Sequence, residues 1–123
     1  MQVNKELTKK YYDDYSPCTC DCCKNYCLQI EKRYPEVCAF LKGLNVDVLK
    51  PFELMFIEEE DKIKYIGCMY VVYGTVDENY KKEIKGITFE INKNNHPSTG
   101  IEEAHFVLDF GAIELPKLLE TLK

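Results

Sequence analysis

Five of the seven cysteines lie within ten residues, in the stretch CTCDCCKNYC at 18–27. Zinc binds four thiolate or imidazole ligands at tetrahedral corners. The two residues between Cys20 and Cys23 let a turn direct both sulfurs at one ion. Cys18 can join from the preceding loop, and Cys27 follows Cys23 by one helical turn. The spacing therefore predicts a metal site formed by Cys18, Cys20, Cys23 and Cys27.

A histidine elsewhere in the chain is the candidate to complete this site, because no second C-x-x-C pair occurs downstream. Structural zinc sites are usually built from two ligand pairs on separate elements. We select His96, which lies in the polar loop at 92–100. Zinc is the favoured ion, although four neighbouring thiolates also suit Cu(I), which accepts fewer ligands.

Three other interpretations of the cysteines remain open. Cys27, Cys38 and Cys68 fit small buried side chains, because cysteine is among the most buried residue types. Cys20 and Cys23 at a helix start could form a redox pair, but the strand that precedes such a pair in thioredoxin-like folds is not indicated. A disulfide framework is the least favoured, since seven is an odd number and disulfides rarely persist in a reducing cytosol.

A second group of residues with chemical potential lies in HPSTGIEEAH, which contains His96, Glu102, Glu103 and His105. Two imidazoles and two carboxylates could hold a hydrolytic metal or perform acid–base catalysis. Neither H-E-x-x-H nor G-x-S-x-G is present, and the same residues fit turns and solvated loops. His105 is flanked by strand-like residues, so we expect a structural role for it.

The composition describes an ordinary globular protein. The chain has 123 residues, enough for one domain, with 46% hydrophobic and 30% charged residues. The net charge of −5, from 16 basic and 21 acidic residues, disfavours nucleic acid as a partner. No segment approaches the roughly 20 apolar residues that a membrane span requires, and no secretory signal is recognisable. We therefore expect a cytoplasmic protein that does not contact membranes.

The apolar periodicity predicts helices first. Residues 1–17 show no clear period and are predicted to form a polar N-terminal arm that is extended or partly ordered. Apolar residues recur at helical spacing between Asp21, which can cap a helix, and Tyr34. Pro35 ends this helix and suits the first turn of a second one. The tail at 114–123 could form a short terminal helix.

The period then changes to that of strands. Four runs rich in β-branched and aromatic residues follow, at 52–60, 62–76, 80–93 and 103–111. The second run is apolar at both alternations, which predicts a central strand with both faces covered. We expect a single α+β domain at 18–123, in which N-terminal helices pack on a mostly antiparallel, four-stranded meander.

The chain resembles a group of small bacterial proteins with no assigned function. The residues that show the resemblance are the cysteine-rich opening, YPEVCAFL leading into VDVLKPFEL, and the later HPSTGIEEAHF, so that it spans most of residues 18–110. The resemblance implies a bacterial, soluble, stand-alone domain. It implies no activity and no catalytic residue.

These features favour a non-enzymatic domain over an enzyme. We expect a structural zinc ion to join the N-terminal arm, the first helix and the loop at 96–100, in a protein that binds a protein partner. The alternatives are a thiol oxidoreductase that uses Cys20 and Cys23, and a metal-dependent hydrolase built around His96 and His105. A buffer that handles Cu(I) or zinc is a further alternative.

Overall fold

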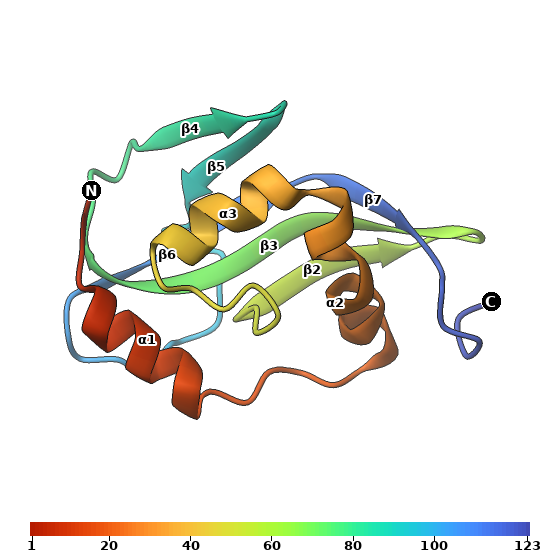
Figure 1. The fold of residues 1–123 in the computed structure, drawn as a ribbon, viewed down its shortest axis with the longest axis horizontal. Coiled ribbons are helices and arrows are strands. Elements are labelled where there is room, and N and C mark those ends of the chain that lie inside the picture. The colour runs from red at the N-terminus through yellow and green to blue at the C-terminus, as the bar shows by residue number, and fades with distance from the viewer.

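Three helices lie in the first part of the chain in the computed structural model, which describes all 123 residues (Figure 1). The Asn4 side chain caps the first helix by accepting a hydrogen bond from the Leu7 N–H at 3.0 Å. Cys20 is the capping residue of the second helix, and Pro35 begins the third. None has the length and apolar character that a bilayer-spanning helix requires. The helices are α1 (Lys5–Asp14), α2 (Asp21–Arg33) and α3 (Pro35–Gly43).

All seven strands belong to one sheet, and every pairing in it is antiparallel. The longest strand, β3, pairs with β1, β2, β6 and β7, and the order along the sheet is β1-β3-β6-β5-β4. The strands are β1 (Gln2–Val3), β2 (Glu53–Glu58), β3 (Lys62–Thr75), β4 (Lys81–Ile84), β5 (Ile87–Ile91), β6 (His105–Gly111) and β7 (Ile113–Pro116).

The predicted α+β class and the central position of β3 are confirmed, but the four-stranded meander is not matched. The run at 80–93 is a hairpin of two strands, because Lys85 and Gly86 have positive φ angles of 51° and 80°. Two such residues form the tight turn that suits a two-residue hairpin. After β3 the chain therefore builds β4 and β5 at the outer edge, and β6 returns to pair with β3.

Within the predicted N-terminal arm, residues 5–14 form helix α1, which packs on the end of β3. The Tyr73 N–H donates a hydrogen bond to Thr8 Oγ1 at 3.1 Å, and the Tyr12 hydroxyl donates to the Val71 carbonyl at 2.7 Å. The buried face of α1 consists of Thr8 and Tyr12, which lack the strong hydropathy that marks an amphipathic helix.

Strand β7 covers the start of the tail at 114–123, and the rest of the tail forms turns, whereas the sequence suggested a short helix there. Ile113 and Leu115 alternate with exposed Glu114, and both apolar side chains are buried. β7 pairs with the first residues of β3. Two apolar residues at this spacing are compatible with either a helix or a strand. The segment forms a strand because it can pair with the edge of β3.

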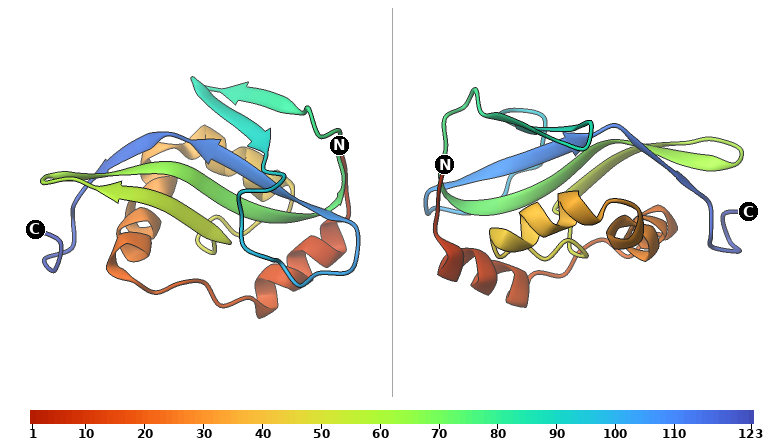
Figure 2. Two further views of the ribbon diagram at one scale, coloured as in Figure 1. Left: turned by 180° about the vertical axis from the view of Figure 1, so that it is seen from behind. Right: turned by 45° about the horizontal axis from the view of Figure 1, so that its top comes forward.

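Helices α2 and α3 cover one face of the sheet, as Figures 1 and 2 show. The main hydrophobic core lies between these helices and the sheet. It includes three fully buried tyrosines, Tyr26, Tyr65 and Tyr70, which we call the tyrosine core. On the opposite face, a small second cluster of Met69, Val71, Tyr73 and Val107 is covered by apolar side chains that include Leu7 and Tyr11 of α1. Helix α1 therefore lies at the sheet edge and contributes to both cores.

Candidate metal centre

Three thiols converge where the chain enters α2. We define the cysteine cluster as Cys18, Cys20 and Cys23, whose Sγ atoms all lie within 4.8 Å of one another. Cys18 and Cys20 are exposed in the connection from α1 to α2 (Figure 1), and Cys23 is buried in the first turn of the helix. Cys20 is the residue at the helix cap, so Cys23 follows it by one turn and faces the same side.

The start of α2 offers a favourable electrostatic environment for thiolates. Cys20 makes no side-chain capping bond, and the first N–H groups of a helix have no partner within it. The positive end of the helix dipole stabilises a negative charge placed there. A nucleophilic or metal-binding sulfur is therefore better stabilised in this position than in a strand or a helix interior.

The thiols of the cluster differ in their tendency to ionise. The Cys20 N–H donates to Cys18 Sγ at 3.4 Å, and this bond, with contributions from the thiols of Cys20 and Cys23, lowers the pKa of Cys18. Burial raises the pKa of Cys23, and the neighbouring thiols raise it further. The cluster thus places one exposed thiol with a lowered pKa beside a buried thiol with a raised pKa, and a bound cation would favour the thiolate form of both.

A hollow of about 190 Å³ borders the cluster. Its other wall comes from the segment that enters β2 and is mostly apolar. An apolar wall lowers the local dielectric and strengthens the attraction between a cation and thiolates. Sequence patterns assigned these wall residues no role in a site, because they become neighbours of the cysteines only through long-range packing: Pro51, Phe52, Glu53, Leu54 and Phe56.

Cys27 lies outside the cluster, although it was predicted as a ligand. Its Sγ contacts the Leu49 carbonyl at 3.4 Å, and burial raises the pKa of this thiol to about 11. One helical turn separates it from Cys23 by about 5–6 Å along the axis, while Cys18 and Cys20 approach from the other direction. Cys22 also points elsewhere, with its Sγ 3.8 Å from Glu58 Oε1.

His96, the predicted histidine ligand, also lies outside the cluster. Its Nδ1 is 2.7 Å from the carbonyl oxygen of Pro97. The imidazole packs edge-on against the ring of Phe52, at 6.2 Å between centroids, and Phe52 is also a wall residue of the hollow. The structure thus places His96 next to the wall of the hollow and not among the three sulfurs.

The second histidine has a structural environment. His105 Nε2 is 2.8 Å from Thr99 Oγ1, and its Nδ1 is 2.8 Å from the Glu103 carbonyl. Both ring nitrogens therefore hold the loop that precedes β6. His96, Glu102 and His105 do not form a group of converging ligand atoms, so the geometry offers no centre for the predicted hydrolase.

The remaining cysteines confirm the interpretation as small core residues. Cys38 and Cys68 are buried, and burial raises the pKa of both thiols. The Cys38 Sγ donates to the Ile30 carbonyl at 3.7 Å, within the packed interface of α2 and α3. These thiols are inaccessible to a shared ion.

No family model matches this chain, and searches of curated proteins and of solved structures return no match. The fold and the site define the class of protein on their own. The chain is an α+β domain with a cluster of three cysteines at the start of a helix, placed so that it could bind a metal ion.

Proposed function

We propose that the cysteine cluster binds one thiophilic metal ion, zinc in the first instance, as a structural site. The observation that supports this most directly is the convergence of three Sγ atoms within 4.8 Å. Around a zinc ion with Zn–S bonds of about 2.3 Å, tetrahedral sulfurs lie roughly 3.8 Å apart. The sulfurs therefore need to move by only about 1 Å to reach that geometry.

The ion would stabilise a segment that has little support of its own. Residues 16–19 make no backbone–backbone hydrogen bond. The last such bond before them is donated by the Tyr15 N–H at the end of α1, and the next is donated by the Lys24 N–H to the Cys20 carbonyl. A metal bridge from Cys18 to Cys23 would join this connection to α2 and so fix the C-terminal end of α1. Three protein thiolates leave one tetrahedral position for a further ligand, and Cys27 and His96 remain predictions for it.

Metal analysis of protein purified without added metal tests the proposal. We expect about one equivalent of zinc in the wild type and loss of the ion in the Cys20→Ser/Cys23→Ser variant, which removes two of the three thiolates. Cys22→Ser is the matched control, because Cys22 lies between them and points toward Glu58. Less than about a tenth of an equivalent in the wild type, with unchanged melting of the double variant, would reject the site.

We further propose that the domain acts by binding a protein partner. The absence of a convergent histidine–carboxylate centre and the acidic net charge of −5 support a binding role over hydrolysis or nucleic-acid recognition. The metal would then maintain the shape of the helical side of the molecule and take no part in chemistry. Affinity capture with wild-type and metal-free protein would show whether one partner binds specifically.

A thiol oxidoreductase is the second candidate, favoured by the contrast between exposed Cys18 and buried Cys23. The Cys18 thiolate would attack a substrate disulfide, and Cys23 would resolve the mixed disulfide. Two electrons would pass to the substrate, leaving a bond between Cys18 and Cys23. The connection before α2 contains no strand, unlike thioredoxin-like folds. Reduction of one equivalent of glutathione disulfide per chain by the reduced protein, abolished in Cys18→Ser, would support this candidate, and no reduction would exclude it.

A further inference from the structure

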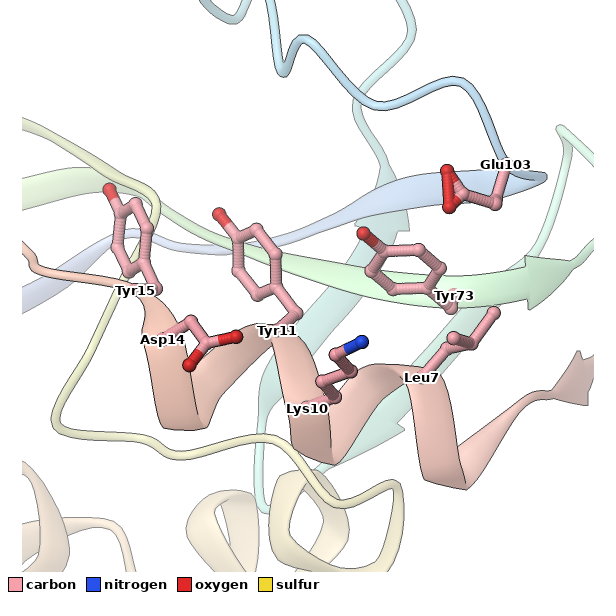
Figure 3. A pocket seen from close by; sticks show the side chains of 7 residues that line it. All are labelled: Leu7, Lys10, Tyr11, Asp14, Tyr15, Tyr73 and Glu103. Atoms are coloured by element: carbon pink, nitrogen blue, oxygen red, sulfur yellow. The ribbon is translucent and has the colours of Figure 1, made fainter.

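A second concave site lies along α1 and ends at Tyr15, whose hydroxyl reaches the wall of the hollow beside the cysteine cluster. A groove of about 350 Å³ runs between α1 and the end of β3, close to the loop that precedes β6 (Figure 3). We define the tyrosine groove by its three aromatic lining residues, Tyr11, Tyr15 and Tyr73. Its volume is within the range of sites that bind small ligands or single side chains.

The three rings form a row along the groove. Tyr11 and Tyr15 are one helical turn apart, and their rings stack with centroids 5.2 Å apart and planes 16° apart. The Tyr73 ring follows at 6.0 Å from that of Tyr11, at an angle of 54°. In Figure 3 the rings stand side by side with their hydroxyls directed away from the helix. Tyr11 and Tyr15 cover part of each other's faces, so a ligand in the groove meets the remaining ring surface and the hydroxyls.

The polar groups of the groove are available for a ligand. The Tyr15 hydroxyl donates to the Phe52 carbonyl at 3.3 Å, whereas the hydroxyls of Tyr11 and Tyr73 have no hydrogen-bond partner within the chain. Burial raises the pKa of all three phenols, so they stay neutral and can donate hydrogen bonds at neutral pH.

Two carboxylates that form no ion pair border the row. Figure 3 places Asp14 beside Tyr15 and Glu103 beside Tyr73. Neither carboxylate takes part in an ion pair, and both residues are exposed. One lysine, Lys10, also borders the groove without an acidic partner. The groove therefore combines aromatic faces with an excess of negative charge, which suits a cation and disfavours a phosphate or carboxylate ligand.

We propose that the tyrosine groove binds an arginine side chain presented by a partner polypeptide. A guanidinium is planar and stacks on aromatic rings, and its fork of N–H donors matches a carboxylate. Stacking on Tyr11 leaves the donor edge free for Glu103 or Asp14 and for the unpaired hydroxyls. A lysine ammonium would gain only part of this, because it is compact and strongly hydrated. Without the partner, Lys10 is the local cation that competes for the same carboxylates.

This inference rests on the proposed partner-binding role but not on the metal. The groove and the cluster share no residue, although Tyr15 at one end of the groove bonds to Phe52 of the wall beside the cluster. Zinc content measured on the same preparations separates the two proposals. A protein that lacks zinc yet binds the arginine probe supports the groove alone, and the reverse result supports the metal site alone.

Titration of the whole protein with short peptides, followed through the tyrosine ring signals in NMR spectra, tests the proposal. The probes are acetyl-Gly-Arg-Gly amide, the same peptide with lysine, and the same peptide with citrulline, which keeps the shape of arginine but not its charge. We expect the arginine peptide to shift the signals of Tyr11 and Tyr73 in a saturable way. The citrulline peptide should bind about tenfold more weakly, because it loses the cation–π and ionic contributions.

Charge variants make the test specific to the groove. Glu103→Gln should weaken the arginine peptide about two- to fivefold, whereas Glu102→Gln, the same change at the neighbouring exposed residue outside the groove, should leave binding unchanged. Lys10→Gln should strengthen binding by a similar factor. Neither glutamate belongs to a helix or strand, so both variants should fold normally.

Three results would overturn the proposal. The first is the absence of saturable shifts with the arginine peptide. The second is equal binding of the citrulline peptide, or of a lysine peptide, which would remove the reason for choosing a guanidinium. The third is an equal effect of Glu102→Gln and Glu103→Gln, which would show that the net charge of the protein and not the groove determines binding.

Discussion

The tyrosine core and the cysteine cluster differ in how their polar atoms are satisfied. In the core, Tyr26 and Tyr70 share a hydrogen bond of 2.7 Å, and the Tyr70 hydroxyl donates to the Val48 carbonyl at 2.7 Å. The Tyr65 hydroxyl donates to the Cys22 carbonyl at 2.6 Å. In the cluster, three sulfurs meet beside a helix start, where Cys18 Sγ accepts a hydrogen bond from the Cys20 N–H and the thiols otherwise face one another.

The difference indicates which region satisfies its polar groups within the chain and which region is suited to bind a ligand. A buried polar network with every hydroxyl paired fixes one conformation without a ligand. A set of sulfurs gathered at the positive end of a helix has no such internal solution, because thiols are weak hydrogen-bonding partners for one another. We therefore assign stability to the tyrosine core and ligand binding to the cysteine cluster.

The largest expected effect comes from Tyr70→Ala, which should lower the free energy of unfolding by about 3–5 kcal/mol because it opens a cavity beneath α2 and α3. Tyr70→Phe keeps the ring and should cost about 1–3 kcal/mol, since it leaves the Val48 carbonyl without its donor. Denaturant unfolding measures both. Zinc content of the folded variants should not change, and a loss of zinc would show that the two regions are not independent.

Removal of one cluster thiol should have a smaller effect that depends on the metal. With free zinc at a hundred times its dissociation constant, the ion contributes about 2.7 kcal/mol to stability. Cys20→Ser should lose that contribution and melt at the same temperature with and without a chelator. If the wild type is equally insensitive to the chelator, the cluster does not bind zinc at this strength.

Asp109 tests the second face of the sheet through pH. Burial raises its pKa above the ordinary value of 3.8, although bonds from Asn92 and the Cys68 N–H oppose the shift. A raised pKa in the folded state means that its contribution to stability is complete below pH 3.8 and is lost as pH rises through the raised pKa. Asp109→Asn should remove this pH-dependent component from unfolding curves. An unaltered pH profile would contradict the assignment to Asp109.

The smallest expected effect is that of Cys27→Ser. Because Cys27 contacts the Leu49 carbonyl and not the cluster, a serine can keep that contact and should change stability by less than about 0.5 kcal/mol. Zinc content should stay the same. Loss of zinc in this variant would identify Cys27 as the fourth ligand and would require α2 to rearrange around the ion.

Local patterns predicted the elements that have strong apolar periodicity. The helix that starts at Asp21, the helix that starts at Pro35 and the central strand β3 all follow from spacing and capping residues. Helix α1 could not be predicted in this way, because it buries Thr8 and Tyr12 against β3 through hydrogen bonds. Gly86 of the Lys85–Gly86 turn lies inside the run at 80–93, and that run was interpreted as one strand.

Part of the candidate site could also be predicted from spacing. The turn between Cys20 and Cys23 follows directly from the C-x-x-C pattern, and Cys18 joins from the adjacent residues. The position of His96 depends on the packing of a loop against Phe52, which no local pattern encodes. The tyrosine groove was missed for the same reason. Tyr11 and Tyr15 have helical spacing, but they meet Tyr73 only through the long-range packing of α1 on β3.

X-ray absorption at the zinc edge, on protein loaded with one equivalent of zinc, tests the central claim most directly. The account predicts about three sulfur neighbours at roughly 2.3 Å and one lighter ligand. The sulfur count should fall by one in Cys18→Ser, which keeps two thiolates of the cluster. Zinc surrounded only by nitrogen and oxygen, or protein that retains no zinc after desalting, would contradict the claim that these three cysteines form a metal site.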